Sequence, residues 1–543
     1  MKKFFNWKLA LIIIIFLAAV LRLWQLGNVP YGMPHDEASY IYNSYSIWKT
    51  GEDILGKFLP LSFNAHSSQS PVEVYLTAPF VGLLGLSEFS ARLPSALLGI
   101  GSVVILFLLI DCLFKNKRIA LIGAFLLSVS PWALQIQRGL WDANFGLFFM
   151  LAGIYVFVAN VRTRKFLWSL IPFLLAFYSY HAIKVYFVAL IPVLIFLFRN
   201  ELIKHKKGAL LFLLGCLFMV ASFLVVIKTQ GVTRAKEVNL FDGTQATSEV
   251  NWERDKNTAP WVLRTIFSNK PLYFLRIMRE NYLQSFSMEY LFLSGGTGNS
   301  TQIINIYFRG ELYIIELPFL LLGLYALMKD KEKFNRNFLF ILLLISPLPS
   351  TVTNDINFVF RDVMMLPIIL AVIAYGINYF LEAINKRKIG IKYIILTMLI
   401  LVYGFLISEY LYQYYFRWPI YGAEAWGKSY KDLVYLIDSK KMDFKNIYVT
   451  NTTNELLLQY AILNRTDPKI VQKVWNGNPL RISNITMFPS CLDNRAGSIS
   501  SFLPKNTLLI APYGECIYAD SPTEKIVDAG EPLHTIWNIY ENK

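Results

Sequence analysis

The sequence predicts an all-α, polytopic membrane protein that carries a small extracytoplasmic α/β domain at its C-terminal end. The chain has 543 residues, of which 55% are hydrophobic and only 16% are charged; its mean hydropathy is +0.43. Apolar runs of about 16–20 residues recur up to residue 411, as expected of helices that cross a bilayer. Residues 412–543 are more polar and alternate short strand and helix patterns.

The net charge of +15 does not indicate a nucleic-acid partner. Most of the excess Lys and Arg lies in short clusters between apolar runs, where it sets the orientation of the protein in the bilayer. The first apolar segment, residues 9–26, follows Lys2, Lys3 and Lys8, which predicts a cytoplasmic N-terminus. No small-residue cleavage site follows this segment, so we expect an uncleaved anchor in the plasma membrane.

The basic clusters decide how many of the later segments cross the bilayer. Apolar segments follow at residues 72–86, 95–114, 119–135, 143–160, 166–181, 183–198, 209–227, 313–328, 337–350, 363–381 and 391–411. Between them lie Lys115/Lys117/Arg118, Arg162/Arg164/Lys165, Arg199/Lys204/Lys206/Lys207, Lys329/Lys331/Lys333/Arg336 and Lys386/Arg387/Lys388. All five clusters share the cytoplasm with the N-terminus only if segment 72–86 does not span. We therefore expect about 11 transmembrane helices, an in-plane helix at 72–86 and an extracytoplasmic C-terminus.

This topology divides the chain into a transmembrane domain, residues 1–411, and an extracytoplasmic α/β domain, residues 412–543. Two outer loops belong to the first domain, at 27–94 and 228–312. In the tail we expect helices at 428–440 and 454–463, and strands at 446–450, 507–511, 525–527 and 534–540. Cys491 and Cys516 lie in the tail, where they form either a disulfide or two free thiols.

An acidic pair opens the first outer loop. Asp36 and Glu37 follow Pro34-His35 about ten residues after the first apolar segment. Two adjacent carboxylates at this place are typical of an enzyme that works on the outer face of a bilayer. The alternative is a solvated pair that caps the loop.

Four cations lie on the side of the membrane where Lys and Arg are disfavoured. They are Arg92, Arg138, Lys184 and Arg361. A single cation at the edge of the hydrocarbon costs free energy unless it pairs or binds something. Gathered around one cavity, the four would bind a phosphate at headgroup depth. Alternatively each pairs locally, as Arg138 can with Asp142.

Carboxylates and phosphate-binding cations on one face indicate glycosyl transfer from a lipid phosphate. A sugar hydroxyl is a poor nucleophile, so a carboxylate, here Asp36, has to take its proton. The lipid phosphate leaves as an anion and needs positive charge around it. Because nucleotide sugars are not available outside the cytoplasm, a polyprenyl-phosphate-linked sugar is the expected donor. The acceptor is a protein, a wall glycan or a glycolipid, and the sequence does not choose among them.

With these features the chain resembles the GT-C glycosyltransferases of the protein O-mannosyltransferase and lipid A aminoarabinose transferase type, which are bacterial glycosyltransferase family 39. Asp36-Glu37 is similar to the acidic pair of that group, Ser70-Pro71-Val72 to its juxtamembrane helix, and Arg92-Leu93-Pro94-Ser95 to the entry of its second span. Later landmarks are Arg138 with Asp142, Tyr178 to His181, Asn281 to Leu293 and Pro347 to Arg361. The resemblance covers residues 1–411.

The resemblance implies an inverting transfer with Asp36 as general base and Glu37 orienting the acceptor or holding a divalent metal. His35, Tyr180, His181 and Asp142 would line the site. The need for a metal stays open; His66 is a second candidate ligand, although a loop histidine is more often solvated. Gln69-Ser70 and Lys184 depart from the pattern of the group, which leaves the donor open and makes lipid A a less expected acceptor.

Two other classes of function account for part of the sequence. A transporter or flippase for lipid-linked sugars would bind the same headgroup, but it predicts ionisable residues deep within several spans and inverted repeats, and the sequence has neither. A receptor with residues 412–543 as its ligand-binding module leaves the acidic pair and the outer cations unexplained.

Overall fold

The computed structural model describes residues 6–63, 69–228, 240, 243–296, 303, 304, 306, 309–330, 332–353, 358–452, 454–492 and 497–543. The chain forms two compact units. The first comprises Met1–Trp24 and Ser95–Tyr410, and the second comprises Gln25–Pro94 and Leu411–Lys543. The chain passes between them three times: between Trp24 and Gln25, within α4 (Glu88–Phe114) and within α21 (Ile389–Tyr412).

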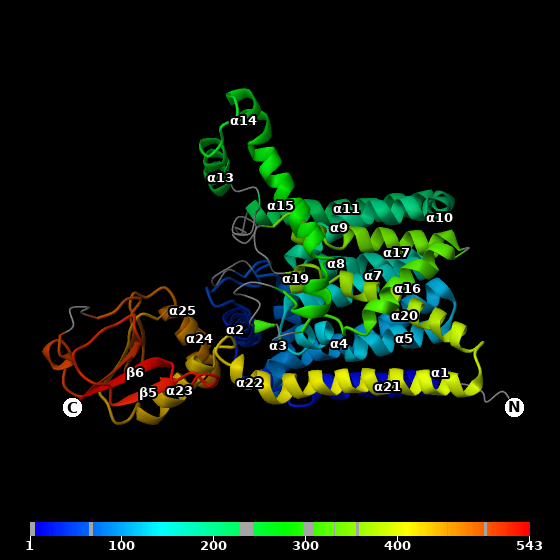
Figure 1. Cartoon of the computed structure of the whole chain (residues 1–543). Helices are drawn as coiled ribbons and strands as arrows, with labels where there is room; N and C mark the ends of the chain where they lie inside the picture. The colour runs from blue at the N-terminus through cyan, green and yellow to red at the C-terminus, as the bar shows by residue number, and fades with distance from the viewer. Residues whose placement is uncertain are drawn as a thin grey trace. The chain divides into compact units, whose positions relative to one another are not determined.

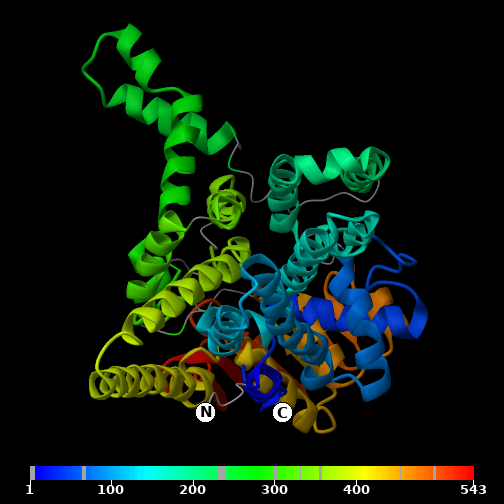
Figure 2. The same ribbon diagram turned by 90° about the vertical axis from the view of Figure 1, so that its right-hand side faces the viewer.

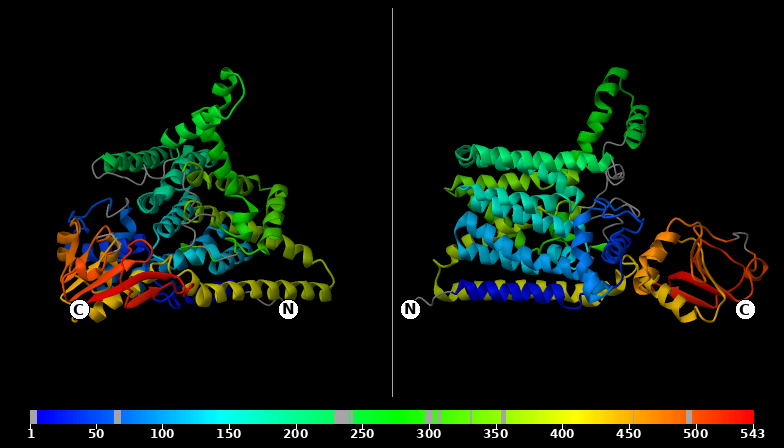
Figure 3. Two further views of the ribbon diagram at one scale, coloured as in Figure 1. Left: turned by 60° about the vertical axis from the view of Figure 1, so that its left-hand side comes forward. Right: turned by 180° about the vertical axis from the view of Figure 1, so that it is seen from behind.

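The long helices of the first unit run side by side along a common direction (Figures 1 and 3). They are α1 (Trp7–Leu23), α4, α5 (Lys117–Val129), α7 (Asp142–Asn160), α9 (His181–Leu197), α11 (Lys206–Val226), α16 (Glu316–Lys329), α17 (Lys333–Ile345), α20 (Met365–Ile384) and α21. Shorter helices connect them: α6 (Pro131–Gln137), η1 (Arg164–Ser169), α8 (Leu170–Phe177), α10 (Arg199–Lys204), α18 (Leu348–Thr351) and α19 (Phe358–Arg361).

These helices agree with the predicted apolar segments, but not every one is long enough to cross a bilayer alone. In the described part of the chain, five helices are long and apolar enough to span, or six if the bent pair α5–α6 forms one span. The several apolar helices agree with a multi-pass membrane protein, whereas the predicted number of 11 spans stays a prediction.

Two of the boundaries between consecutive helices lie at prolines. Pro131 opens α6, and the Ser130 hydroxyl accepts a hydrogen bond from the Ala133 amide, so the chain bends by 57° between α5 and α6. Segment 337–350 also divides: α17 ends at Ile345, and α18 begins after Pro347. A proline lacks the amide that the preceding helix would need to continue.

Helices α16 and α20 of the first unit make an extensive contact, in which two glycines let the backbones approach closely. A β-carbon at Gly323 would lie 2.1 Å from the Val372 carbonyl oxygen, and one at Gly376 would lie 2.0 Å from that of Phe319. Small residues let helix backbones meet, which is how helices gain packing energy in a bilayer. Most of α20 is buried, by α5 and α17 as well as by α16.

The loop predicted at 228–312 contains helices in its described part. α13 (Gly243–Asp255), α14 (Trp261–Phe267) and α15 (Lys270–Gln284) form a helical hairpin, and a π-helical turn, η3 (Glu289–Leu293), follows. The hairpin projects away from the other helices of its unit (Figures 1 and 2).

The second unit combines the first outer loop with the C-terminal tail. The loop contributes α2 (His35–Thr50), α3 (Pro71–Leu84) and the start of α4. The tail contributes the turns η5 (Gln413–Arg417) and α22 (Trp418–Tyr421), the helices α23 (Lys428–Lys440), α24 (Asn454–Leu463) and α25 (Pro468–Val474), and a six-stranded sheet. α2 packs against α3, α24 and α25.

The sheet has the order β2-β3-β1-β4-β6-β5. Its strands are β1 (Asn446–Val449), β2 (Leu480–Ile482), β3 (Ile485–Met487), β4 (Thr507–Pro512), β5 (Glu524–Val527) and β6 (Thr535–Asn542). β1 lies parallel to β3 and β4, with Ile447 opposite Ile485 and Leu508, and the other pairs are antiparallel. Cys491 and Cys516 form a disulfide beside the core around Leu509.

The predicted elements of the tail agree with the structure, whereas β2, β3, α25 and the short turns η5, α22 and η6 (Ile499–Ser501) were not predicted. β2 and β3 have three residues each, too few for an alternating pattern to stand out from chance. The small C-terminal α/β domain expected from the sequence is therefore present. The domain boundaries at residues 411 and 412 stay a prediction.

A close approach between backbones holds the loop and the tail together in the second unit. Gly32 has a φ of +105°, and a β-carbon there would lie 2.2 Å from the Trp426 carbonyl oxygen. On the other side, Gly427 has a φ of +70°, and its β-carbon would lie 3.0 Å from the Met33 oxygen. Segment 32–34, which leads into α2, therefore fits against segment 426–428 only because both glycines lack a side chain.

We predict that Gly32→Ala destabilises the protein much more than Gly56→Ala. Both substitutions place a β-carbon on a residue with positive φ, at a cost of about 1–2 kcal/mol. Only Gly32 adds a collision with backbone, since nothing lies within 4 Å of a β-carbon at Gly56. Thermal unfolding of the two purified variants measures the difference, which we expect to be several degrees. Equal midpoints would show that the approach to Trp426 relaxes at little cost.

Candidate active site

Asp36 lies in the first turn of α2, two residues after Pro34, and is half-buried. A carboxylate is favoured there because the free amides of a helix N-terminus carry partial positive charge. The turn is fixed by Gln69, whose Nε2 donates to the Asp36 carbonyl oxygen at 3.3 Å. The hydroxyl of Ser39 donates in turn to Gln69 Oε1 at 3.0 Å. The side chain of Asp36 therefore stands on a turn that is tied to the segment entering α3.

Glu37, the second acid of the pair, has a different environment. It forms a two-pronged ion pair with Arg92: Nε lies 2.8 Å from Oε1, and Nη2 lies 2.7 Å from Oε2. Both side chains are 0% exposed. Arg92 also donates to the carbonyl oxygens of Pro30 at 2.8 Å and Gly32 at 2.6 Å, and its guanidinium lies 5.4 Å from the Trp426 ring.

These contacts favour a structural role for both residues. The predicted roles of Arg92 as a phosphate ligand and of Glu37 as an acceptor or metal ligand stay predictions. A buried guanidinium that meets a carboxylate and backbone carbonyls is already well satisfied. The proposed chemistry therefore needs neither Glu37 nor Arg92.

The tail supports α2 from its N-terminal end. Gln459 of α24, which is fully buried, donates from Nε2 to the Met33 carbonyl oxygen at 2.6 Å. Lys431 of α23 pairs with Glu88 at the start of α4, at 2.8 Å. Met33, three residues before Asp36, therefore rests on the C-terminal domain.

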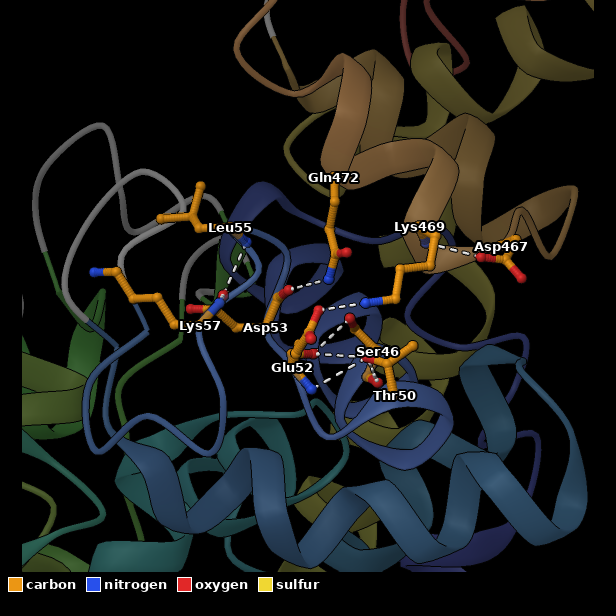
Figure 4. A network of polar contacts seen from close by, with 9 residues as sticks. All are labelled: Ser46, Thr50, Glu52, Asp53, Leu55, Lys57, Asp467, Lys469 and Gln472. Atoms are coloured by element: carbon orange, nitrogen blue, oxygen red, sulfur yellow. Dashed lines mark hydrogen bonds and ion pairs between the residues drawn. The ribbon is translucent and has the colours of Figure 1, made fainter.

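A second set of contacts supports the C-terminal end of α2 (Figure 4). Lys469 forms an ion pair with Glu52 at 2.6 Å, and Gln472 donates to the Asp53 carbonyl oxygen at 2.8 Å. One carboxylate oxygen of Asp53 accepts from the amides of Leu55 and Lys57. Burial raises the pKa of Asp53 above its ordinary value, although those two amides oppose the shift.

Glu455, in the first turn of α24, is an acid that no sequence pattern indicated as a site residue. It is half-buried and lies within electrostatic range of His35 and Asp36. Burial raises the pKa of Glu455, the negative charge of Asp36 raises it further, and His35 lowers it. The helix was predicted at its observed bounds, but nothing in the sequence linked it to the acidic pair.

Arg138 is buried in the first unit, directly after α6. Its Nη1 donates to the carbonyl oxygens of Leu21 at 2.8 Å and Arg22 at 3.0 Å, at the C-terminal end of α1. A cation there is favoured by the helix dipole. Arg22 itself is buried and donates to Gln137 Oε1 at 2.8 Å and to the Ser128 oxygen at 3.0 Å. The sequence did not indicate that Arg22 and Gln137 would form a network with Arg138.

Lys184 and His181 lie in the first turns of α9 and face the same aromatic ring. Lys184 Nζ is 4.7 Å from the centroid of Phe223, and the His181 ring is 6.2 Å from it. Tyr180 precedes α9 and packs against Gly146 of α7, the helix that Asp142 begins. The start of α9 therefore lies beside the first turns of α7.

Arg361 ends α19, and its Nη1 donates to Thr353 Oγ1 at 2.8 Å. Phe360, the preceding residue, packs on Trp141, with ring centroids 5.0 Å apart. The Trp132 indole donates to the Val359 carbonyl oxygen at 2.8 Å. Segment 358–361 is thus packed against the corner between α6 and α7 that carries Arg138.

Within each unit, several of the predicted site residues therefore lie close to one another. In the first unit, the segments with Arg138, Lys184 and Arg361 gather around the start of α7, together with Asp142, Tyr180 and His181. In the second unit, Asp36 lies with His35 and Glu455, and Glu37 lies with Arg92. His66 falls outside the described residues. Where side chains are described, no three or more His, Cys, Asp and Glu are arranged to hold a metal.

Sequence comparison relates this chain to mannosyltransferases. Residues 68–226 match the family model described as dolichyl-phosphate-mannose-protein mannosyltransferase. One relative, described as "Putative mannosyltransferase YkcB" of Bacillus subtilis (strain 168), is 25% identical over 206 residues. That alignment covers 34% of this chain and only 28% of the relative.

The fold is similar to two solved glycosyltransferases. ArnT from Cupriavidus metallidurans, bound to undecaprenyl phosphate, matches with a TM-score of 0.52 over 97% of both chains, at 13% identity. AglB from Archaeoglobus fulgidus, an oligosaccharyltransferase solved with an inhibitory peptide and a dolichol-phosphate, matches with a TM-score of 0.52. It is also 13% identical, over 94% of this chain and 69% of AglB. The resemblance to GT-C glycosyltransferases expected from the sequence is confirmed.

We predict that Glu37→Gln destabilises the protein severely. Removing one charge of a buried pair leaves the other uncompensated, at a cost of about 3–5 kcal/mol. The double variant Glu37→Met with Arg92→Met removes both charges and should recover much of this stability. The yield and thermal unfolding of purified variants measure the effect, with Glu280→Gln, from an exposed pair with Arg279, as the control. A Glu37→Gln variant that is as stable as the wild type but fails to bind donor would instead support a role in binding.

Proposed function

We propose that this protein is an integral membrane glycosyltransferase that moves a sugar from a polyprenyl-phosphate-linked donor to an acceptor on the extracytoplasmic face, with inversion. Asp36 is its general base. The observation that carries the proposal is Asp36 itself, a half-buried carboxylate on a helix turn held from several sides. The mannosyltransferase model that matches residues 68–226 begins at the segment that holds this turn.

In the proposed reaction, Asp36 removes the proton from an acceptor hydroxyl while the hydroxyl oxygen attacks the anomeric carbon of the donor sugar. The bond between that carbon and the phosphate oxygen breaks, and its electron pair leaves with the polyprenyl phosphate. Attack from the side opposite the leaving group inverts the anomeric centre. A base on a rigid turn can be held within hydrogen-bond reach of the acceptor, as general-base catalysis requires.

Arg138, Lys184 and Arg361 are the proposed ligands of the donor phosphate. The packing of their three segments around the start of α7 supports a common function. Positive charge near the phosphate stabilises the leaving group as its negative charge develops. Mannose is the first donor sugar to test, because the sequence relatives are described as mannosyltransferases.

The proposal includes the topology predicted from the charge clusters. The N-terminus lies in the cytoplasm, the bilayer is crossed about 11 times, α3 lies in the plane of the outer interface, and residues 412–543 are extracytoplasmic. The gathering of Arg138, Lys184 and Arg361 at one end of the first unit supports this orientation. A protease-protection assay on tagged termini in membrane vesicles tests it independently of catalysis.

We predict that Asp36→Asn abolishes sugar transfer and leaves folding intact. The amide is nearly the same size as the carboxylate but cannot accept the proton. Transfer is measured in liposomes with a panel of polyprenyl-phosphate sugars and cell-envelope acceptors, by release of polyprenyl phosphate. Glu52→Gln is the matched control, because Glu52 lies in the same loop and its pair with Lys469 is at the surface.

Transfer at the wild-type rate by the Asp36→Asn variant would remove Asp36 as the base. Tight donor binding without any release, in wild type and variant alike, would favour a transporter of lipid-linked sugars.

Arg361→Ala should weaken donor binding several-fold and reduce the turnover of bound donor less. Its side chain carries a charge that interacts with the donor phosphate before and during the reaction. Arg361→Lys keeps the positive charge but lacks the planar guanidinium that binds a phosphate through two hydrogen bonds, so we expect an intermediate affinity. Donor titration measures the affinity, and Arg481→Ala, at an exposed position of β2, is the control. An unchanged affinity in Arg361→Ala would place Arg361 outside the phosphate site.

A further inference from the structure

The hairpin α13–α15 of the first unit has an apolar tip that its own fold leaves exposed. Trp261 is 72% exposed, Phe267 60% and Ile266 52%. Trp252, Val262 and Leu263 are also exposed, and together these six residues form what we call the apolar tip. An exposed apolar surface of this kind marks a contact with a membrane or with another protein.

The hairpin keeps its shape without these six side chains. α13 packs on α15, and Ala246 and Val250 of α13 are buried. Arg276 forms an ion pair with Glu253 at 2.6 Å and donates to the Phe267 carbonyl oxygen at 2.8 Å. Arg254 donates to the Ser268 oxygen at 2.8 Å. The polar groups therefore fold the hairpin, and the apolar tip is left to be covered by something else.

The hairpin is fixed at its base to the end of the first unit that also carries Arg361. Asn281 of α15, which is buried, donates to the carbonyl oxygens of Ser350 at 3.3 Å and Thr353 at 2.9 Å. The Tyr282 hydroxyl donates to the Leu344 oxygen at 3.0 Å, near the end of α17. The hairpin is thus attached at the level where these helices end.

The direction in which the hairpin leaves the helices of the first unit indicates what covers the apolar tip. α15 leaves the unit across the direction of α11 and its neighbours, and both other hairpin helices lie beyond the bundle (Figures 1 and 3). A helix that runs across membrane-spanning helices at their ends lies along the surface of the bilayer. A hairpin that extends past the bundle at that level lies over lipid.

We propose that the hairpin α13–α15 is a membrane-interface element whose apolar tip is inserted among the headgroups of the outer leaflet that surrounds the protein. The composition fits this occupant, because the two tryptophans, one phenylalanine and three aliphatic residues of the tip lie close in the sequence to Arg254, Arg264 and Lys270. Aromatic rings with a polar edge and long basic side chains are favoured at this depth. A helix with an apolar face of this kind binds in the interface rather than across it.

The outer-leaflet contact rests on the proposed topology but not on the proposed reaction, and it affects the segment that carries Arg361. Thr353 accepts a hydrogen bond from Arg361 through its hydroxyl, and its carbonyl oxygen accepts one from Asn281. An inserted hairpin would therefore hold the Arg361 segment at headgroup depth. The phosphate of a polyprenyl donor lies at that same depth.

The test is photo-crosslinking of the full-length protein in liposomes of phosphatidylethanolamine and phosphatidylglycerol. A photoreactive phenylalanine analogue replaces Leu263 in the tip, or Asn251, an exposed polar residue of α13, as the matched control. Lipid adducts are counted by mass spectrometry. We expect several-fold more lipid adducts at position 263 than at 251, and a loss of that excess in the variant that also carries Trp261→Asp and Phe267→Asp.

Equal lipid labelling at both positions would overturn the proposal. Crosslinks from position 263 to a second copy of the chain, in place of lipid, would also overturn it and identify a dimer contact. Because the readout needs no turnover, it stays informative even if Asp36→Asn transfers sugar normally. In that case the proposed reaction fails and the membrane contact stands.

Discussion

The buried ion pair between Glu37 and Arg92 is the interaction on which the second unit depends. It joins the first turn of α2 to the start of α4, and through Pro30 and Gly32 it also holds the chain that leads into α2. Removing two charges from water is costly, and their attraction repays this only when the geometry is good and the remaining donors are bonded. Here two parallel hydrogen bonds and two backbone carbonyls meet that condition. The pair adds little net stability by itself, but it fixes one arrangement, because any other would leave a charge buried alone.

This constraint gives the two adjacent acids separate tasks. Successive residues of a helix point about 100° apart, so Glu37 can face the interior while Asp36 faces outward. Neighbouring contacts preserve this difference. Gln69 donates to the Asp36 carbonyl oxygen, and Gln459 donates to that of Met33. The glycines at 32 and 427 allow segments 32–34 and 426–428 to meet. The C-terminal domain therefore supports the turn of the proposed base through its contacts with Gly32 and Met33. Its Glu455 adds a third carboxylate near Asp36, from a helix far away in the sequence.

Much of the architecture could be predicted because it rests on local patterns. Apolar runs indicated the helices of the first unit, and the helix at 454–463 was predicted at its observed bounds. The partners of charged residues could not be predicted. With 52 Lys and Arg and 37 Asp and Glu in the chain, nothing local selects Arg92 for Glu37 or Lys431 for Glu88. The hairpin in the long outer loop was missed as well, because its helices pack on each other through few buried residues and show no strong apolar period.

Gln69 shows how a departure from a family pattern can follow from local physics. The resemblance implies that relatives that modify lipid A carry Glu-Lys in place of Gln69-Ser70, so this chain lacks one possible metal ligand and one expected phosphate ligand. In this chain the side-chain amide donates a hydrogen bond to the Asp36 carbonyl oxygen and accepts one from Ser39. An ionised carboxylate can accept but cannot donate, so a glutamate at this position would lose the bond to Asp36 and add a negative charge beside it. The amide therefore serves the turn that carries the proposed base. Its presence does not argue against a lipid-phosphate donor.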